Sequence, residues 1–334
     1  MANKKPHLSV VVPVFNGAAT LRDCAKSILQ QPFTDIEVIF VNDGSHDGSA
    51  AVMAELEAQD GRVRCVHQNN QGLPLARNAG LRQASGRFVS FVDCDDFVEP
   101  NFYTSAFEGP TPSTFDLFVS GMDRFANEKI LPYPHQTVIT PVELFEAVFC
   151  SNHVGLSVCN KIFDLELMQA KGIWFKPIQF AEDIVFLSEY LSYTHTIVYT
   201  PQSLYSYTIT ADSMTNSAKN QRRFKPRDYE ILDALDLARQ SDCHQSNENF
   251  RRFFAVRAVR SALRLLLLMV LCHEDQRTAL QRAQGFIRSG LSAFFNNPHT
   301  SLTLKMGALT FALMPQALLI KMMTTNKRLL QKLS

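Results

Sequence analysis

Short apolar runs alternate with amphipathic segments over the first hundred residues of the chain. Runs rich in β-branched and aromatic residues predict strands at residues 8–14, 36–41, 63–67 and 88–92. Apolar residues at helical spacing predict helices at residues 19–30, 49–58 and 73–84. Strands that are apolar throughout, with helices between them, indicate a parallel sheet covered on both faces.

The pattern changes in the second half of the chain. From about residue 109 to 221 it is mixed, and prolines mark loops. Helical patterns then follow at residues 227–240, 250–272, 275–289 and 302–323. We therefore expect an α/β domain over residues 1–221, with parts at about 8–107 and 108–221. A helical region over residues 222–334 should follow it.

Charge is divided unevenly along the 334 residues, although the net charge is only +1. Residues 1–221 carry 15 Lys and Arg against 24 Asp and Glu, whereas residues 222–334 carry 18 against 8. This asymmetry suggests two different surfaces.

The seven cysteines form no C-x-x-C pair and no cluster with zinc spacing. They are typical of reduced, mostly buried thiols, which places the chain in the cytoplasm.

Three carboxylates follow the strand predicted at residues 88–92. Asp93, Asp95 and Asp96 would repel one another unless a positive charge lies beside them. Carboxylate oxygens suit Mg²⁺ or Mn²⁺, and open α/β sheets bind ligands at the carboxyl ends of their strands. The alternative is an acidic turn in solvent.

Two further segments carry candidate binding residues. Asp43 ends the second strand, where it could accept hydrogen bonds from a base or a ribose; a plain Asx turn is the alternative. Gly72 and Pro74 mark a loop entering a helix, and Arg77 could add donors for a phosphate there. For Arg77 the alternative is a structural pair with a carboxylate. The first strand is not followed by G-x-G-x-x-G, so this is not the dinucleotide fingerprint.

An acidic pair, Glu182 and Asp183, lies among apolar residues. Partial burial raises the pKa of a carboxylate and makes it a better base. The alternative is a helix N-terminus, where the dipole favours acids.

The C-terminal region is basic, because residues 249–334 carry 13 Lys and Arg against two acids. Arg257, Arg260 and Arg264 share one predicted helical face. The mostly apolar segment 302–323 contains Pro315 and two lysines, so we expect it to lie in an anionic membrane interface rather than to span the bilayer. A solvated face over a helical core is the alternative. No nucleic-acid motif accompanies the basic residues.

Four segments occur together in a characteristic order, and all lie within residues 8–107. They are S-V-V-V-P-V-F-N from Ser9, V-N-D-G-S-H-D-G from Val41, G-x-x-x-A-R-N-x-G from Gly72 and D-C-D-D from Asp93. This set resembles the family 2 glycosyltransferases of the GT-A fold.

The resemblance implies a mixed, mostly parallel sheet flanked by helices, a nucleotide-sugar donor and Mn²⁺ or Mg²⁺. It implies that Asp93 opens the metal motif, that Asp95 and Asp96 bind ribose and metal, and that Arg77 lies near the base or the phosphates. It also implies that the nucleoside pocket is lined by Pro13, Val14, Phe15 and Asp43.

Later segments continue the resemblance. F-A-E-D-I-V-F, from Phe180, is similar to the family's G-E-D-x-x-F, which implies that Asp183 deprotonates the acceptor, with Glu182 as the next candidate. Ala181 replaces the usual Gly, and Cys159 stands where an aromatic residue is common. Tyr205 and Tyr207 also match, but Thr208 stands where an Arg is often found.

We therefore expect a metal-dependent glycosyltransferase that moves a sugar, with inversion, from a UDP-linked donor to a hydroxyl. A glycan or lipid-linked glycan at the inner face of the cell membrane is the expected acceptor, as in bacterial capsule, exopolysaccharide or wall-polymer synthesis. Two alternatives are an inactive nucleotide-binding scaffold and a nucleotidyltransferase. The second should carry a basic Gly-rich loop after the first strand, and residues 13–20 contain no Lys or Arg.

Overall fold

The computed structural model describes residues 5–112, 114–122, 135–151, 155–208, 225–272, 274 and 276–322. The chain forms two compact units. The first contains residues 1–148 and 152–208, and the second contains residues 149–151 and 209–334. Each unit is considered by itself below.

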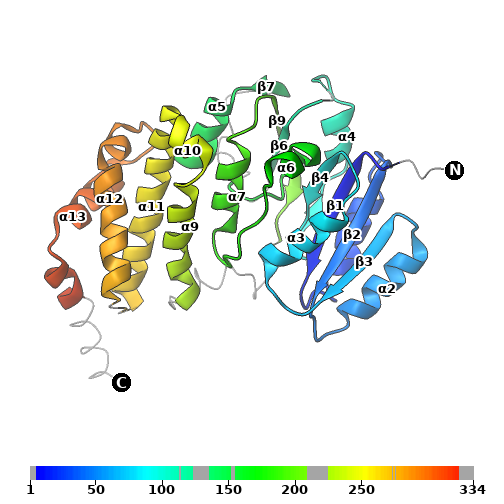
Figure 1. Ribbon diagram of the computed structural model, residues 1–334, viewed down its shortest axis with the longest axis horizontal. Coiled ribbons are helices and arrows are strands. Elements are labelled where there is room, and N and C mark those ends of the chain that lie inside the picture. Colours follow the sequence, from blue (N-terminus) through cyan, green and yellow to red (C-terminus); the bar gives the residue numbers. More distant parts are fainter. Residues whose placement is uncertain are drawn as a thin grey trace. The chain divides into compact units, whose positions relative to one another are not determined.

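Nine described strands of the first unit form one mixed sheet (Figure 1). Their order is β3-β2-β1-β4-β8-β6-β9-β5, and β7 pairs with β9. The strands are β1 Leu8–Val14, β2 Ile36–Asp43, β3 Val63–Gln68, β4 Phe88–Phe91, β5 Phe97–Val98, β6 Leu117–Met122, β7 Thr137–Ile139, β8 Lys161–Asp164 and β9 Ile197–Ser206. β1 to β4 pair in parallel, whereas β8 is antiparallel to both β4 and β6. This sheet confirms the predicted fold class.

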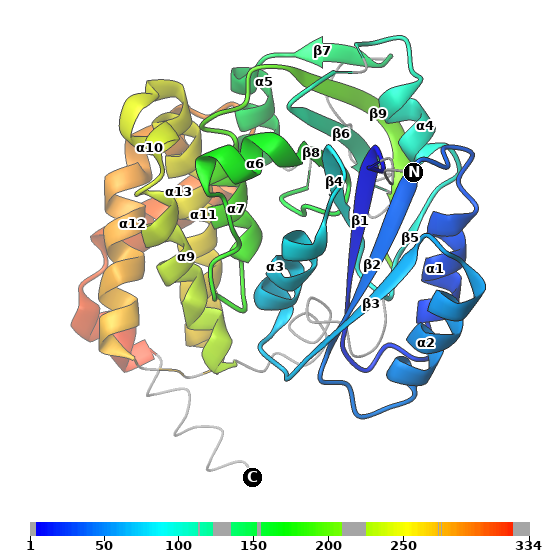
Figure 2. The same ribbon diagram turned by 45° about the vertical axis from the view of Figure 1, so that its right-hand side comes forward.

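Helices cover both faces of the parallel part, as the apolar strands predicted. Helix α3 (Leu73–Gln83) packs on β1 and β2, and it lies across the sheet from α1 (Leu21–Leu29) and α2 (Ser49–Gln59) (Figure 2). A Cβ at Gly80 would come 2.3 Å from Val11 Cγ1, so glycine allows α3 to approach β1 this closely. The remaining helices of this unit are α4 Phe102–Phe107, α5 Pro141–Phe145, the first part of a π-helix Glu146–Ser151, α6 Leu165–Lys171 and α7 Glu182–Tyr190.

The second unit is helical, as predicted. A 3₁₀ turn, Pro226–Tyr229, leads into α9 Glu230–Ala238, and α10 Asp242–Ser246, α11 Glu248–Cys272, α12 Arg277–Asn296 and α13 Leu302–Leu313 follow. Helices α9, α11 and α12 lie side by side (Figure 1).

The prediction of one helix over residues 302–323 is wrong. Helix α13 ends at Leu313, two residues before Pro315, because proline disfavours helical backbone at the residue before it. A second helical segment, Gln316–Met322, is bent by 112° from α13. Within the described ranges no single helix has the length and hydropathy needed to cross a membrane, and this bent pair meets the requirement only when its two parts are taken together.

Candidate functional site

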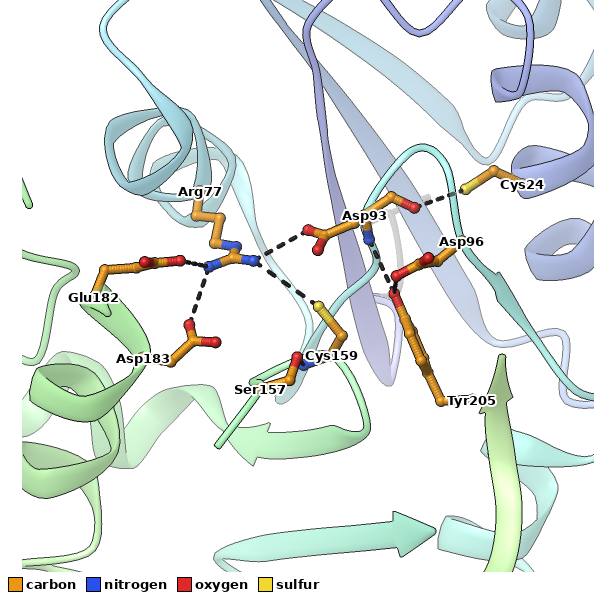
Figure 3. A network of polar contacts seen from close by, with 9 residues as sticks. All are labelled: Cys24, Arg77, Asp93, Asp96, Ser157, Cys159, Glu182, Asp183 and Tyr205. Carbon is orange, nitrogen blue, oxygen red and sulfur yellow. Dashed lines mark hydrogen bonds and ion pairs between the residues drawn. The ribbon is translucent and has the colours of Figure 1, made fainter. Parts of the chain in front are cut away.

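The buried guanidinium of Arg77 joins four segments of the first unit that are distant in sequence. It comes from α3, and it meets the turn after β4, the start of α7 and the loop before β8 (Figure 3). Nη1 lies 3.0 Å from Glu182 Oε1 and 3.2 Å from Asp183 Oδ1. Nη2 lies 3.0 Å from Asp93 Oδ1 and 3.9 Å from Cys159 Sγ. Three carboxylates thus share one cation.

The loop before α3 is built to place Arg77. Asp43, at the end of β2, accepts hydrogen bonds from the side chain of Gln68 and from the backbone amides of Gln71 and Gly72. Gly72 has a φ of +88°, which favours glycine, and α3 begins at the next residue. Asp43 is therefore buried in this loop, and its predicted contact with a nucleobase stays a prediction.

Asn78 and Phe175 support the guanidinium from the other side. The Asn78 amide donates to the Phe175 carbonyl at 2.8 Å, and its oxygen accepts from the Phe175 amide at 3.0 Å. The Phe175 ring then lies 5.2 Å from Arg77 Cζ, within cation–π range. For Arg77 the structure shows the alternative considered above, a structural pair with carboxylates. A contact between Arg77 and phosphate stays a prediction.

The acids at the start of α7 have raised pKa values. Burial and the neighbouring Asp183 raise the pKa of Glu182 to about 8, although Arg77 opposes the shift. Burial also raises the pKa of Asp183, and Arg77 again opposes it. The Asp183 side chain keeps 20% of its surface exposed, so an incoming hydroxyl could reach it. A carboxylate of this kind is suited to act as a general base.

Ala181 precedes these acids in the left-handed conformation, with a φ of 67° and a ψ of 25°. A residue with a side chain pays about 1–2 kcal/mol there, which explains why a glycine fits this position well. The backbone turn that aims Glu182 and Asp183 at Arg77 is nevertheless formed with alanine.

The turn after β4 holds the other acids. Tyr205, from β9, donates its hydroxyl to Asp96 Oδ2 at 2.6 Å and accepts the Asp93 amide at 3.3 Å. The Thr208 amide donates to Asp96 Oδ1 at 2.8 Å. Burial and Asp93 raise the pKa of Asp96 to about 8, and the same two causes raise the pKa of Asp95.

These acids fit a divalent cation by their donor chemistry. They are hard oxygen donors, and their raised pKa values reflect burial first and then repulsion by Asp93, which a cation would relieve. Within the described part of the chain, however, no three His, Cys, Asp or Glu side chains are arranged around one point as a metal site. The assignment of the metal to Asp95 and Asp96 thus stays a prediction.

The expected nucleoside pocket lies where β1 ends. Pro13 and Val14 are buried in the sheet, whereas Phe15 is 47% exposed and meets His46 edge-on at 6.5 Å. Asn16 joins this loop to the loop after β2, because its amide donates to Ser45 Oγ and its side-chain oxygen accepts the His46 amide. The exposed ring offers a surface for stacking.

The sequence alone assigned no role to Lys161, Asn78 or Tyr205. Lys161 is fully buried at the start of β8, in the V-C-N-K-I-F segment. In this segment Asn160 and Lys161 are polar residues inside an otherwise apolar run. They were the available signal, because buried polar groups need partners.

Comparison with known proteins agrees with this geometry. Residues 9–147 match the family model "Glycosyl transferase family 2". The uncharacterized glycosyltransferase EpsJ of Bacillus subtilis is 29% identical over 217 residues, 63% of each chain, so the match spans less than two thirds of that relative.

Two solved structures share the fold. TarS 1–349 of S. aureus, in complex with UDP-GlcNAc, superposes with a TM-score of 0.62 at 16% identity, covering 97% of this chain and 92% of that one. The mannosyltransferase PcManGT of Pyrobaculum calidifontis, in complex with GDP-Man and Mn²⁺, superposes with a TM-score of 0.57 at 16% identity, covering 96% and 85%. Residues 9–147 therefore match glycosyl transferase family 2, and the chain has the GT-A fold.

Proposed function

We propose that the protein transfers a sugar from a UDP-linked donor to a hydroxyl of a glycan or lipid-linked glycan, in bacterial polysaccharide synthesis. The observation that carries the proposal is the Arg77 cluster, which consists of the guanidinium and the carboxylates of Asp93, Glu182 and Asp183. It brings a buried acid pair on α7 into contact with the acidic turn after β4. A base for the acceptor and an acidic turn for the donor thus share one cation.

Asp183 is the proposed base. Its exposed edge would receive the acceptor hydroxyl, and its raised pKa would let it take the proton as the new bond forms. Arg77 holds the carboxylate in place, and the Val158 backbone beside it lowers its pKa. Glu182 is the second candidate, but its greater burial makes it harder for an acceptor to reach.

Asp95 and Asp96 are the proposed holders of Mn²⁺ or Mg²⁺, which would offset charge on the leaving diphosphate. Tyr205 and the Thr208 amide fix the Asp96 carboxylate for this task. Phe15 and Asp43 are proposed to face the nucleoside. The complexes of TarS with UDP-GlcNAc and of PcManGT with GDP-Man and Mn²⁺ support a nucleotide-sugar donor and a divalent metal. With the base and the leaving group on opposite faces of the sugar, we propose inversion.

Binding of UDP by the purified protein should depend on a divalent metal and on Asp96. Calorimetry in Mn²⁺ and in EDTA should show a loss of affinity of about 10- to 100-fold without the metal. Asp96→Ala should bind UDP equally weakly in both buffers, while Asp23→Ala, an exposed site on α1, should behave as the unmodified protein. Equal affinity in EDTA and Mn²⁺ would show that the site is assigned wrongly.

A screen of nucleotide sugars for donor hydrolysis with Mn²⁺ then separates an enzyme from a scaffold. Turnover with one donor supports the proposal and identifies the sugar. UDP binding without turnover of any donor would support the inactive scaffold instead.

We also propose that the second unit attaches the enzyme to the inner face of the cell membrane. Large apolar side chains of α13 are exposed, including Leu302 at 73% and Leu313 at 72%. The three arginines predicted on one face are not equally available, because Arg257 is only partly exposed and its pKa falls to about 10 through burial and through Arg260 and Arg264. Arg264 is exposed, and exposed cations beside apolar side chains suit an anionic lipid surface.

Vesicle sedimentation tests the membrane proposal. Binding should rise with the fraction of anionic lipid and fall in about 1 M salt, where the Debye length is about 3 Å. Changing Leu302 and Leu313 to Asp should weaken binding at every salt concentration, and changing them to Met should not. If the full-length chain stays in the supernatant with anionic vesicles at low salt, α13 is not a membrane surface.

A further inference from the structure

A buried lysine organises the loop that lies against the proposed base. Lys161 is fully buried, and its Nζ donates to the Gly155 carbonyl at 2.8 Å, the Ser157 carbonyl at 2.6 Å and Asn160 Oδ1 at 2.9 Å. These three acceptors match the three N–H donors of an ammonium group. All three belong to the short segment 155–160, so this segment wraps around the lysine charge.

Other hydrogen bonds tighten the same segment. The Lys161 amide donates to the Val158 carbonyl at 3.2 Å, and the Cys159 amide donates to Ser157 Oγ at 3.1 Å. The Asn160 side-chain amide donates to the Ser120 carbonyl on β6. The loop is thus fixed to the sheet at one end and to the lysine in its middle.

The segment also contacts both halves of the Arg77 cluster. The Val158 backbone lies beside the Asp183 carboxylate, where it lowers the pKa. The sulfur of Cys159 lies 3.9 Å from Arg77 Nη2 (Figure 3). Movement of this loop would therefore change both the contacts of the proposed base and the packing of the guanidinium.

We infer that Lys161 is a positioning residue, which holds the 155–160 loop against Arg77 and Asp183 and so keeps the proposed base in place for proton transfer. Lys161 does not touch the reacting atoms; it acts through the loop. The inference rests on the proposed role of Asp183.

The electrostatics support this inference. Burying an ammonium group is costly unless it is paired and hydrogen-bonded, and an apolar side chain could fill the same space. Burial lowers the pKa of Lys161 to about 7, and Asp183 opposes the shift. The lysine charge therefore also favours the ionised form of Asp183, which is the form that accepts a proton.

Lys161→Met tests the inference, because methionine keeps the volume and removes all three donors. We expect kcat to fall by about tenfold or more, the scale of a lost hydrogen bond to a charged group, while the Kd for UDP changes little. The matched control is Lys176→Met, which removes a partly exposed lysine that pairs with Glu189 on the same helix as the base. It should leave kcat and the Kd for UDP unchanged.

A double variant separates the two proposals. If Lys161 acts through Asp183, Lys161→Met should lower the residual rate of Asp183→Asn only slightly. Normal turnover in Asp183→Asn would overturn the proposed base. A deleterious Asp183→Asn together with a fully active Lys161→Met, or with fully multiplicative losses in the double variant, would overturn the role of Lys161 alone.

If Lys161→Met fails to fold, a backbone change decides the question. Replacing Val158 by its α-hydroxy acid, introduced by nonsense suppression, removes the backbone N–H beside Asp183 and weakens the Ser157 carbonyl as an acceptor for Lys161, while the lysine side chain itself is kept. The inference expects the same loss in kcat with UDP binding retained. An ester variant with normal kcat would contradict it.

Discussion

Asp183→Asn is expected to lower turnover by about 10² or more, the usual contribution of a positioned general base, while UDP binding changes little. Asparagine keeps the size of the side chain and its contact with Arg77 but cannot accept the proton. Because burial raises the pKa of Asp183, turnover of the unmodified enzyme should rise with pH above the ordinary range of an aspartate. The pH dependence of kcat and calorimetry with UDP would measure both effects.

The matched control is Glu189→Gln, at the other end of α7, where the carboxylate pairs with Lys176 at 3.0 Å. This change should leave kcat within about twofold, because a partly exposed ion pair away from the proposed site contributes little. Near-normal turnover of Asp183→Asn would remove this residue from the mechanism and leave Glu182 as the base to test.

Arg77→Met should destabilise the fold by about 3–5 kcal/mol, because it leaves buried carboxylates without their cation. Asp93, Glu182 and Asp183 all lie within 3.2 Å of the guanidinium nitrogens. Chemical denaturation at pH 7 would measure the loss. Arg82→Met is the control: it is exposed on the same helix and stacks over Trp174, so it should cost at most about 1 kcal/mol.

The loss in Arg77→Met should shrink as the pH falls. Without the guanidinium, the folded-state pKa values of Glu182 and Asp183 rise further above their unfolded values, so the folded state binds more protons than the unfolded state. The destabilisation is then complete above the raised pKa values and is relieved as the pH falls through them towards the unfolded values. A loss that is independent of pH between about 5 and 8 would mean that lost packing, rather than uncompensated charge, is the cause.

The parallel half of the fold was predictable because its signals are local. Each of the first four strands is a short run that contains β-branched or aromatic residues and lies between turn residues, and each observed strand lies within a residue or two of its prediction. The last helix was misjudged for a local reason as well. Apolar periodicity continues through residues 314–315, but proline ends the helix at Leu313.

The candidate site was only partly predictable, because its central contacts are long-range. The acids at Asp93 and Asp183 could be found from their positions at the ends of apolar runs. That Arg77 meets Glu182, which is 105 residues away in sequence, depends on how α3 and α7 pack in the folded sheet. Similarly, the positions of the amides that surround Asp43 follow from the folded loop and not from the side chain itself.

Arg77 contacts Asp93, in the turn after β4, on one side and Asp183 on the other. The charges of this turn and of the proposed base are therefore coupled through one guanidinium. Any event that draws Asp93 away from the guanidinium leaves more of the positive charge of Arg77 to stabilise ionised Asp183. The proton affinity of the proposed base then falls. Linkage is reciprocal, so loss of the proton from Asp183 must change the affinity of the turn for its ligand by the same factor. Through this one arginine, donor binding and acceptor activation would be thermodynamically coupled.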